Sequence, residues 1–381
     1  MQFQLPAIFY IAIDFEYQQG KGSYHLYICP VQTDYLIIGQ GIAGTFLSWN
    51  LLRNGKSVIV IDENNPVTAS RVASGIINPV TGRRLVRTWM IEELLPFAEQ
   101  AYEEIGEDIG MQICKQTDIV NFHATQQMSN AWHERMSEGE EYLHEASNIQ
   151  DYTRYFTTIY GAGITRPGLL IDLQALLPAW RNELKREGAL LEGIFNIEDC
   201  IITPTEVLYK DIKAKKLILC NGIQGFDNNY FKKLPYAFSK GEMLIVKIQG
   251  LPANNIFKQG ITIVPLHDDY FWIGSSFEWE FEHANPTKAF REKTEAILSD
   301  WLKLPYKITD HKAAIRPASL ERRPFVGLHP HHPSVGIFNG MGTKGCSLAP
   351  YFSHQFVQHL LHHKPINPQA DIHRFTKILS V

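Results

Sequence analysis

Apolar runs and helical spacing alternate most regularly between residues 34 and 62. An unbroken apolar run at residues 35–38 predicts a buried strand, and a second run at residues 58–61 predicts another. Between the two runs, residues 42–53 show the spacing of apolar positions that is typical of a helix. A strand, a helix and a second strand in succession predict a βαβ unit and therefore a parallel sheet.

The rest of the chain carries both kinds of pattern. Amphipathic spacing predicts helices at residues 90–105, 124–138, 173–187 and 286–304, and strand-like runs fall at residues 112–122, 161–171, 190–197, 200–209 and 215–222. Residues 236–249, 261–265 and 270–276 alternate, so they predict an antiparallel sheet in which Asp268 and Asp269 form a hairpin tip. Residues 1–32 hold a further candidate strand or hairpin, to which we assign no function.

These patterns predict an α/β fold with two discontinuous domains. A Rossmann-type cofactor-binding domain is expected to comprise residues 33–88, 151–234 and 314–381. An inserted α+β substrate domain with an antiparallel sheet is expected to comprise residues 89–150 and 235–313. Residues 1–32 would be an extension of unknown role.

Three glycines follow the first strand of the βαβ unit at the spacing that dinucleotide binding requires. Gly39 permits the tight turn, Gly41 lets the backbone approach a diphosphate, and Gly44 lets the helix pack closely on the sheet. The helix begins with Ile42 and Ala43, and its unpaired N–H groups and positive dipole end favour phosphates.

An acidic pair closes the second strand of the unit. Asp62 is placed to accept hydrogen bonds from ribose hydroxyls, and Glu63 lies next to it. The ligand is therefore expected to contain an ADP moiety. This stretch alone leaves open whether the ADP belongs to NAD or to FAD.

The overall composition is that of an ordinary globular enzyme. The 381 residues are 45% hydrophobic and 20% charged, and the net charge is −4. This balance gives no indication of nucleic acid or an anionic membrane as a general partner. No apolar run approaches the ~18 residues of a spanning helix, and the run at residues 7–13 has no basic residue before it, which makes it a poor signal peptide.

Cysteine and histidine spacing disfavours a metal site. The five cysteines, Cys29, Cys114, Cys200, Cys220 and Cys346, form no CxxC pair, which favours a reducing cytoplasm over a disulfide framework. The histidines at positions 329, 331, 332, 359, 362 and 363 lack a carboxylate or cysteine partner at ligand spacing. We therefore expect no metal.

Three later segments make the pattern more specific. The segment SRVASGIINP contains Ser70, Arg71, Gly75 and Ile76, a strand-like run ends at Gly222, and a glycine-rich turn at residues 340–345 precedes a final helix. With the Arg-Pro pair at residues 316–317, these segments resemble the D-amino-acid oxidase and glycine oxidase family of FAD enzymes. The resemblance spans residues 35–361.

The resemblance implies noncovalently bound FAD. Members that attach the flavin covalently near Arg316 carry a cysteine where this chain has Ile315. The segment with Ser70 would pass along the diphosphate and the isoalloxazine ring, and we also expect contacts from Ile197 and Gly222. The turn that would surround the flavin pyrimidine comprises Gly340, Met341, Gly342, Thr343, Lys344 and Gly345.

Two cations are implied in catalysis. The arginine that matches Arg316 commonly pairs with the substrate carboxylate, for which a planar guanidinium offers two parallel donors. Lys344 could add positive charge beside the reduced flavin ring. Thr343 stands where some glycine-oxidase-like members carry a further arginine, and no counterpart of a substrate-binding tyrosine is found.

The expected activity is oxidation of a C–N bond in a small amine or amino acid. A hydride would pass to flavin N5, water would hydrolyse the imine product, and O2 would reoxidise the flavin. Two alternatives remain at this stage: an oxidase-like module of a tRNA wobble-uridine modification enzyme, and an NAD-dependent dehydrogenase. The sequence leaves open the substrate, the electron acceptor and the oligomeric state.

Overall fold

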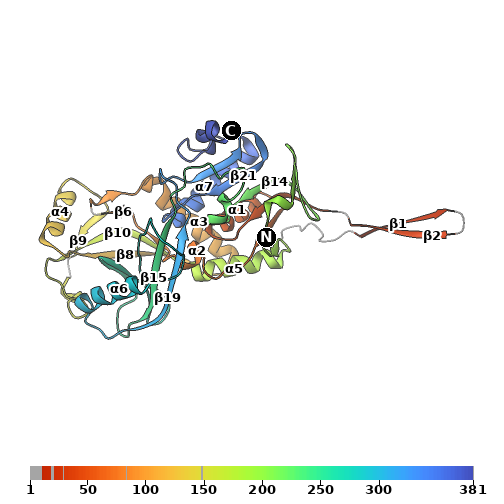
Figure 1. The fold of residues 1–381 in the computed structure, drawn as a ribbon. Coiled ribbons are helices and arrows are strands. Elements are labelled where there is room, and N and C mark those ends of the chain that lie inside the picture. Colours follow the sequence, from red (N-terminus) through yellow and green to blue (C-terminus); the bar gives the residue numbers. More distant parts are fainter. Residues whose placement is uncertain (1–10, 19–20, 29, 83, 147–148, 381) are drawn as a thin grey trace.

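Two large sheets and the helices around them form the structure, a computed structural model that describes residues 11–18, 21–28, 30–82, 84–146 and 149–380. The eight-stranded sheet lies among α1, α3, α5 and α7, and the nine-stranded sheet lies beside it with α4 and α6 on its outer side (Figure 1). The α-helices of the described residues are α1 (Ile42–Arg53), α2 (Ala69–Val72), α3 (Ile91–Ile109), α4 (Gln126–Ser137), α5 (Leu173–Arg186), α6 (Lys288–Trp301), α7 (Gly345–His362) and α8 (Thr376–Leu379).

The eight-stranded sheet contains the predicted βαβ unit. Parallel pairing joins β3 to β4 and to β14, and β14 in turn pairs with β21. The strands of this sheet are β11 (Leu190–Glu192), β4 (Val58–Asp62), β3 (Val31–Ile38), β14 (Ile212–Leu219), β13 (Val207–Tyr209), β12 (Cys200–Ile202), β20 (Phe325–His329) and β21 (His332–Asn339). The apolar run at residues 35–38 is thus a central parallel strand.

Burial on both faces explains why this strand reads as unbroken apolar sequence. Ile37 packs against a core that includes residues of α1, α3, α5 and α7, whereas Leu36 and Ile38 pack into a second core with β14, β21 and the C-terminal segment. Successive side chains of a strand point to opposite faces. A strand that is covered on both faces therefore needs apolar residues at every position.

The nine-stranded sheet is antiparallel except where β16 pairs with β8. Across it, the strands are β19 (Lys307–Arg316), β15 (Ser239–Lys247), β18 (Tyr270–Gly274), β17 (Ile261–Pro265), β16 (Asn255–Gln259), β8 (Cys114–Phe122), β10 (Ala162–Ile171) and β5 (Ile76–Ile77), with β9 (Leu143–Glu145) also paired to β10. Asp268 and Asp269 lie in the turn between β17 and β18, as the sequence predicts.

The two faces of the nine-stranded sheet meet different partners. Leu244 and Ile273 pack in a core with Leu298 and Trp301 of α6, whereas Trp272 packs on the other face in a core that includes Val72 of α2. The indole N–H of Trp272 donates to the backbone carbonyl of Val72 at 2.8 Å. This second face therefore turns toward the expected cofactor-binding segment.

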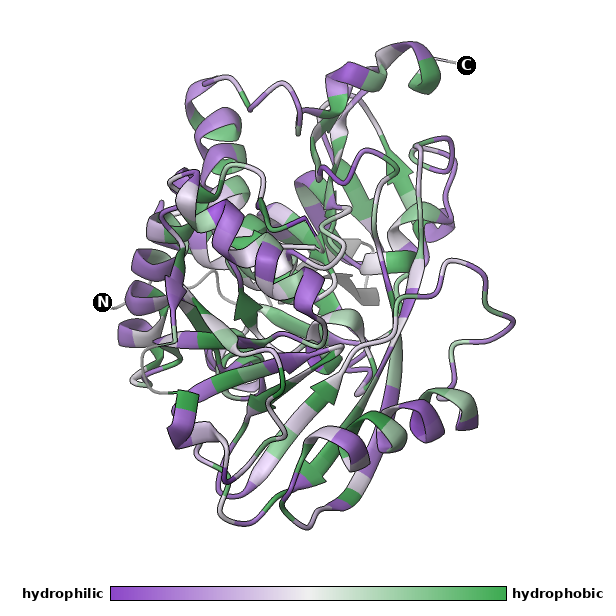
Figure 2. Ribbon diagram, turned by 90° about the vertical axis from the view of Figure 1, so that its left-hand side faces the viewer, coloured by the Kyte–Doolittle hydropathy of each residue, from purple (hydrophilic) through white to green (hydrophobic). Residues whose placement is uncertain are grey.

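The hydropathy pattern agrees with this arrangement. Hydrophobic residues gather along the strands and on the inner sides of the helices, and the outer helices carry many hydrophilic residues (Figure 2). None of the helices in the described part of the chain is long and apolar enough to cross a membrane.

Two segments lie elsewhere than the expected domain boundaries place them. Helix α3 packs in one core with α1, α5 and α7, although the sequence pattern puts residues 89–150 in the substrate domain. Strand β10 pairs with β8 in the nine-stranded sheet, although the pattern puts residues 151–234 in the cofactor-binding domain. An apolar strand pattern predicts a strand but does not identify the sheet that takes it up.

Two other expectations concern the N-terminal residues and residues 200–209. Strands β1 (Ile11–Gln18) and β2 (Lys21–Ile28) pair as an antiparallel hairpin, which extends away from the two sheets in Figure 1. The expected single strand at residues 200–209 is instead the hairpin of β12 and β13. Strands β6 (Val80–Thr81) and β7 (Val86–Arg87) form a separate small sheet.

An aromatic cluster stabilises the core beneath α6. The ring of Phe156 is fully buried, with centroids 5.0 Å from Phe122, 4.9 Å from Phe257 and 4.7 Å from Trp301. We expect Phe156→Ala to lower the free energy of unfolding by about 3–5 kcal/mol, because the substitution leaves a cavity that its neighbours fill only in part. Chemical denaturation measures this loss. The control is Ile201→Ala at an exposed strand position, and equal stability of the two variants would contradict the packing described here.

A buried histidine should make stability fall in mild acid. Burial lowers the pKa of His329 from 6.5 to about 4, and nearby His332 and His331 act in the same direction. Its Nδ1 accepts the backbone N–H of His331 at 3.1 Å, as a neutral ring can. Because the unfolded chain binds this proton at higher pH than the folded chain, stability should decrease as pH falls from about 6.5 to about 4.

His329→Asn keeps an acceptor but removes the titration, so melting temperature should depend less on pH in this range. The control is His267→Asn, which removes a histidine that is exposed rather than buried. A His329→Asn variant with the wild-type slope would exclude His329 as its source.

Candidate functional site

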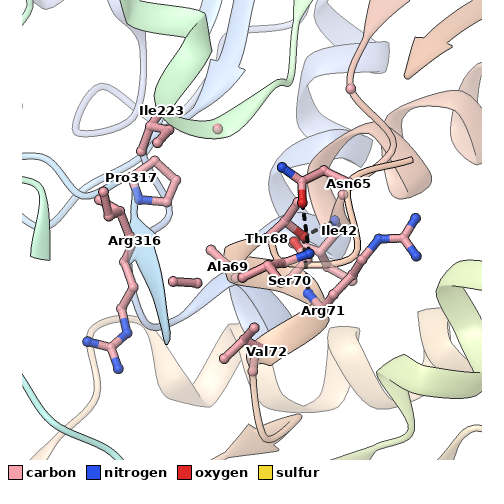
Figure 3. A pocket seen from close by; sticks show the side chains of 18 of the residues that line it. Ile42, Asn65, Thr68, Ala69, Ser70, Arg71, Val72, Ile223, Arg316 and Pro317 are labelled. Atoms are coloured by element: carbon pink, nitrogen blue, oxygen red, sulfur yellow. Dashed lines mark hydrogen bonds between the residues drawn. The ribbon is translucent and has the colours of Figure 1, made fainter. Parts of the chain in front are cut away.

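A cavity of about 650 Å³ lies between the two sheets. The turn after β3, the start of α1, α2, the end of β14 and the start of α7 line it from the side of the eight-stranded sheet. Strands β15 and β19 line it from the side of the nine-stranded sheet. In Figure 3, Arg316 and Pro317 lie on one side of the cavity, and the segment from Thr68 to Val72 lies on the other.

The turn between β3 and α1 has the geometry that its glycines require. Gly39 has φ +95°, a conformation that residues with a side chain rarely adopt, and a Cβ at Gly44 would overlap the carbonyl oxygen of Gly39. A Cβ at Gly41 would lie 2.9 Å from Ser70 Oγ, where the cavity wall is formed. Gly39 and Gly41 therefore bring main chain without side chains to the edge of the cavity, and Gly44 lets α1 pack against this turn.

Two helices begin at this cavity without a side-chain cap. Neither Gly41 before α1 nor Lys344 before α7 caps its helix through a side chain. Both helix starts contribute to the cavity wall, and Asn50 of α1 donates to Ser353 Oγ of α7 at 2.7 Å. Because helix N-termini carry partial positive charge and unpaired N–H groups, this edge of the cavity favours an anion.

Ser70 closes part of the same edge. Ser70 Oγ accepts the backbone N–H of Ile42 at 3.0 Å. Ser70 belongs to α2, and the N-cap residue of this helix, Thr68, accepts the backbone N–H of Arg71 through its side chain at 3.3 Å. The guanidinium of Arg71 donates to Asn64 Oδ1 at 3.0 Å. The contact between α2 and α1 places the predicted diphosphate segment and the glycine turn side by side.

Asp62 is already well supplied with hydrogen bonds. Its Oδ2 accepts the backbone N–H of Gln40 at 2.8 Å, and its Oδ1 accepts the backbone N–H of Asn64 at 2.9 Å and the Arg181 guanidinium at 2.6 Å. Arg181 is itself buried and also contacts Glu192 at 3.0 Å. These contacts fix the carboxylate at the end of β4, where it lines the cavity.

Arg316 ends β19 and presents a partly buried cation in the cavity wall. Its Nη1 and Nη2 each donate to the carbonyl of Ser276 at 3.2 Å, and its guanidinium carbon lies 4.9 Å from the ring centroid of Phe277. Burial lowers the pKa of Arg316 to about 10, which leaves it charged at neutral pH. Among the described residues, no carboxylate forms an ion pair with it.

The cavity brings together most of the residues that the sequence predicts for the site. The predicted residues that line it are Gly39, Gly41, Ile42, Ala43, Asp62, Glu63, Ser70, Arg71, Gly222, Arg316, Met341, Gly342, Thr343 and Gly345. They come from segments that are up to about 300 residues apart in the chain, and the fold collects them in one place.

The other six predicted residues are not part of the cavity lining; they are Gly44, Gly75, Ile76, Ile197, Gly340 and Lys344. Two of these glycines allow close packing that a side chain would prevent. A Cβ at Gly75 would overlap the carbonyl of Ile171, and one at Gly340 would lie 2.7 Å from the Phe325 ring. Ile76 pairs with Leu170 in the nine-stranded sheet, and Ile197 packs beside the core under the eight-stranded sheet.

Lys344 belongs to the glycine-rich turn but is not part of the cavity lining. Burial lowers its pKa, and the nearby cations Arg323 and Arg322 lower it further. Its neighbours Thr343 and Gly345 do line the cavity. A direct role of the ammonium group in catalysis therefore has no support from its position.

Several lining residues were not predicted. Residues 193–195, residues 241–243 and Trp272 contribute to the wall, as does Asn339 at the end of β21. Alternation along residues 239–247 predicts a strand with two faces, but which face meets a cofactor depends on how the two sheets pack. The sequence signal was a pair of charged residues, Lys240 and Glu242, just before the apolar run at residues 243–246.

The shape and donors of the cavity fit FAD. The start of α1 would hold the diphosphate, Asp62 would face the adenosine ribose, and the start of α7 with Gly342 would meet the pyrimidine end of the flavin. Gly41 leaves open the space that a side chain would fill. No group of three or more His, Cys, Asp or Glu side chains in the described residues could hold a metal ion.

Comparisons with known proteins agree with this arrangement. The family model described as FAD dependent oxidoreductase matches residues 34–358. Glycine oxidase of Pseudomonas putida is 23% identical over 356 residues, which cover 87% of this chain and 95% of the oxidase.

Solved structures show the same fold. Glycine oxidase from Bacillus cereus superposes with a TM-score of 0.73 at 17% identity, over 87% of this chain and 96% of that chain. Iminodiacetate oxidase from Chelativorans has a TM-score of 0.71 at 17% identity, over 88% and 98% of the two chains. The family match covers the βαβ unit, both sheets and the C-terminal glycine turn. This chain belongs to the FAD-dependent oxidoreductase family, and its cofactor is FAD.

Proposed function

We propose that this enzyme oxidises the C–N bond of a small amine or amino acid that carries a carboxylate. The observation that supports this most directly is Arg316, a partly buried guanidinium in the cavity wall for which the described residues supply no carboxylate. Removing a cation even partly from water without an anionic partner is unfavourable. A substrate carboxylate would relieve that cost and would be held in a fixed orientation.

The protein's part in this reaction is to bind and orient the substrate. When bound, FAD accepts the hydride from the carbon next to nitrogen. Arg316 would fix the carboxylate through two donors, and the apolar residues around it, Ile315 and Met243, would keep water from the reacting carbon. No general base is needed if the amine binds in its neutral form.

The names of the relatives support this substrate class. Glycine oxidases and an iminodiacetate oxidase share the fold, and their names denote substrates with both an amine nitrogen and a carboxylate. Neither the NAD-dependent dehydrogenase nor the tRNA-modifying module receives support from these comparisons.

We also propose that FAD is bound noncovalently. Cys220 and Cys346 line the cavity, but burial raises the pKa of the Cys346 thiol to about 12 and that of Cys220 further. Both groups are therefore protonated and poor nucleophiles at neutral pH.

The four described cysteines are free thiols, which supports a reducing cytoplasmic location.

The experiment is a visible spectrum followed by acid precipitation. Oxidised-flavin bands with FAD in the supernatant are expected for noncovalent binding, whereas FAD that stays with the pellet would disprove it. Aerobic turnover is then tested with glycine, sarcosine and iminodiacetate by oxygen consumption, with the corresponding carboxylate-free amines as matched controls. Preference for the carboxylate-free amines would exclude the proposed role of a carboxylate.

A further inference from the structure

A group of charges on β15 and β19 lies near Arg316 and has no role in the reaction described above, although Glu242 and His311 contribute to the cavity wall. Lys240 and Glu242 lie on the same face of β15, and their side chains are 2% and 0% exposed. Lys240 Nζ lies 3.1 Å from Glu242 Oε1 and 3.5 Å from Glu278 Oε2. His311 of β19, the strand beside β15 in Figure 1, places Nε2 2.9 Å from Glu242 Oε2.

Glu242 holds one end of the segment between β18 and α6. Its backbone N–H donates to Ser276 Oγ at 3.0 Å, and its backbone carbonyl accepts the N–H of Ser276 at 3.2 Å. Two main-chain hydrogen bonds between Lys240 and Glu278, at 2.8 and 3.0 Å, also join this segment to β15. The start of this segment is therefore tied to β15.

The carboxylate of Glu242 also holds the other end of the same segment. Its Oε2 accepts the backbone N–H of Thr287 at 2.6 Å, and its Oε1 accepts the Thr287 hydroxyl at 2.8 Å. Between the two ends, Ala284, Asn285 and Pro286 line the cavity. One buried residue thus fixes both ends of a segment that forms a wall of the cavity.

The same segment sets the position of Arg316. Nη1 and Nη2 of Arg316 each donate one hydrogen bond to the carbonyl of Ser276 at 3.2 Å, and a further bond runs from Nη1 to the carbonyl of Lys240 at 3.4 Å. The two acceptors therefore belong to the main chain that Glu242 and Lys240 organise. A shift of Ser276 would move the guanidinium relative to a bound carboxylate.

We propose that Glu242, with Lys240, is a positioning residue: it fixes Ser276 and residues 284–286, and thereby sets the orientation of Arg316 toward a carboxylate ligand. This inference rests on the proposed role of Arg316. It assigns to a charge pair that takes no part in the reaction an indirect effect on substrate affinity, through Arg316, with little effect on FAD binding.

The test uses the FAD-loaded enzyme and acetate as a probe, with binding followed by the change in flavin absorbance. Glu242→Gln keeps the shape of the side chain but removes the charge that holds Lys240 and His311. We expect acetate to bind about tenfold more weakly, because a small displacement of an orienting group is costly, while FAD content stays at the wild-type level. The matched control is Glu278→Gln, since Glu278 is partly exposed and more distant from Lys240, and it should change acetate affinity by less than about twofold.

A second variant distinguishes a loss of positioning from a general loss of stability. Ser276→Ala removes only the hydroxyl that accepts the N–H of Glu242, and it should weaken acetate binding without lowering the melting temperature as far as Glu242→Gln does. Wild-type acetate affinity in both variants would overturn the positioning role, even if Glu242→Gln melts earlier. Wild-type enzyme that contains FAD but does not bind acetate would overturn the role of Arg316 and this inference with it, whereas enzyme without FAD would overturn the cofactor assignment.

Discussion

Gly41→Val is expected to produce a folded protein that no longer retains FAD. Gly41 precedes α1 at the cavity edge, and even a Cβ at this position would approach Ser70 Oγ to 2.9 Å. The larger side chain would occupy the space through which a diphosphate reaches the N–H groups of the helix. We expect FAD affinity to fall at least about 100-fold, since loss of this contact should cost about 3 kcal/mol or more.

Absorbance of the purified variant and titration with added FAD measure this loss. The matched control is Gly55→Asn, because Gly55 follows the same helix, has φ +69° and would have no other atom within 4 Å of an added Cβ. Asparagine tolerates this conformation, so the control should keep its FAD. Full FAD occupancy in Gly41→Val would show that the diphosphate lies elsewhere.

Arg316→Leu should raise the KM for a carboxylate substrate by roughly 100-fold or more and leave FAD content unchanged. Truncating one partner of a buried charge pair costs about 2–5 kcal/mol. The side chain lies in the cavity wall on the opposite side from Ser70 (Figure 3), so its loss should not disturb the diphosphate site. Steady-state kinetics together with the flavin spectrum separate the two effects.

Arg316→Lys tests whether charge alone is sufficient. Lysine keeps the cation but cannot offer two parallel donors in one plane, so an intermediate KM is expected. Arg291→Leu serves as the control, because Arg291 lies on α6 in the same domain and is exposed. If Arg316→Leu had wild-type KM for glycine and other carboxylates, Arg316 would not belong to the substrate site.

Local motifs predicted the part of the site that depends on short stretches of chain. The glycine turn, α1 and Asp62 lie within one βαβ unit, so their spacing alone places them together. The Arg316 segment and the turn at residues 340–345 were placed by resemblance, since nothing in their own pattern brings them to the βαβ unit. The family match and the cavity agree with that placement.

The hydropathy pattern of the sequence did not predict contacts between segments that are far apart in the chain. Arg181 binds Asp62 from 119 positions away in the chain, and the strand pattern of β10 does not reveal that it pairs with β8 in the other sheet. Lys240 and Glu242 are visible in the sequence as charges beside an apolar run, but Thr287, the partner of Glu242, follows only after three further strands. Each of these contacts depends on tertiary packing between elements that lie far apart in the chain.

The most direct measurement is anaerobic mixing of the purified, FAD-containing enzyme with amines and amino acids, followed by the oxidised-flavin absorbance. The account predicts that at least one small amine bearing a carboxylate bleaches the flavin, that oxygen restores the absorbance, and that Arg316→Leu needs a much higher concentration of the same compound. Bleaching by carboxylate-free amines alone, with equal effectiveness in wild-type enzyme and Arg316→Leu, would contradict the proposed substrate class.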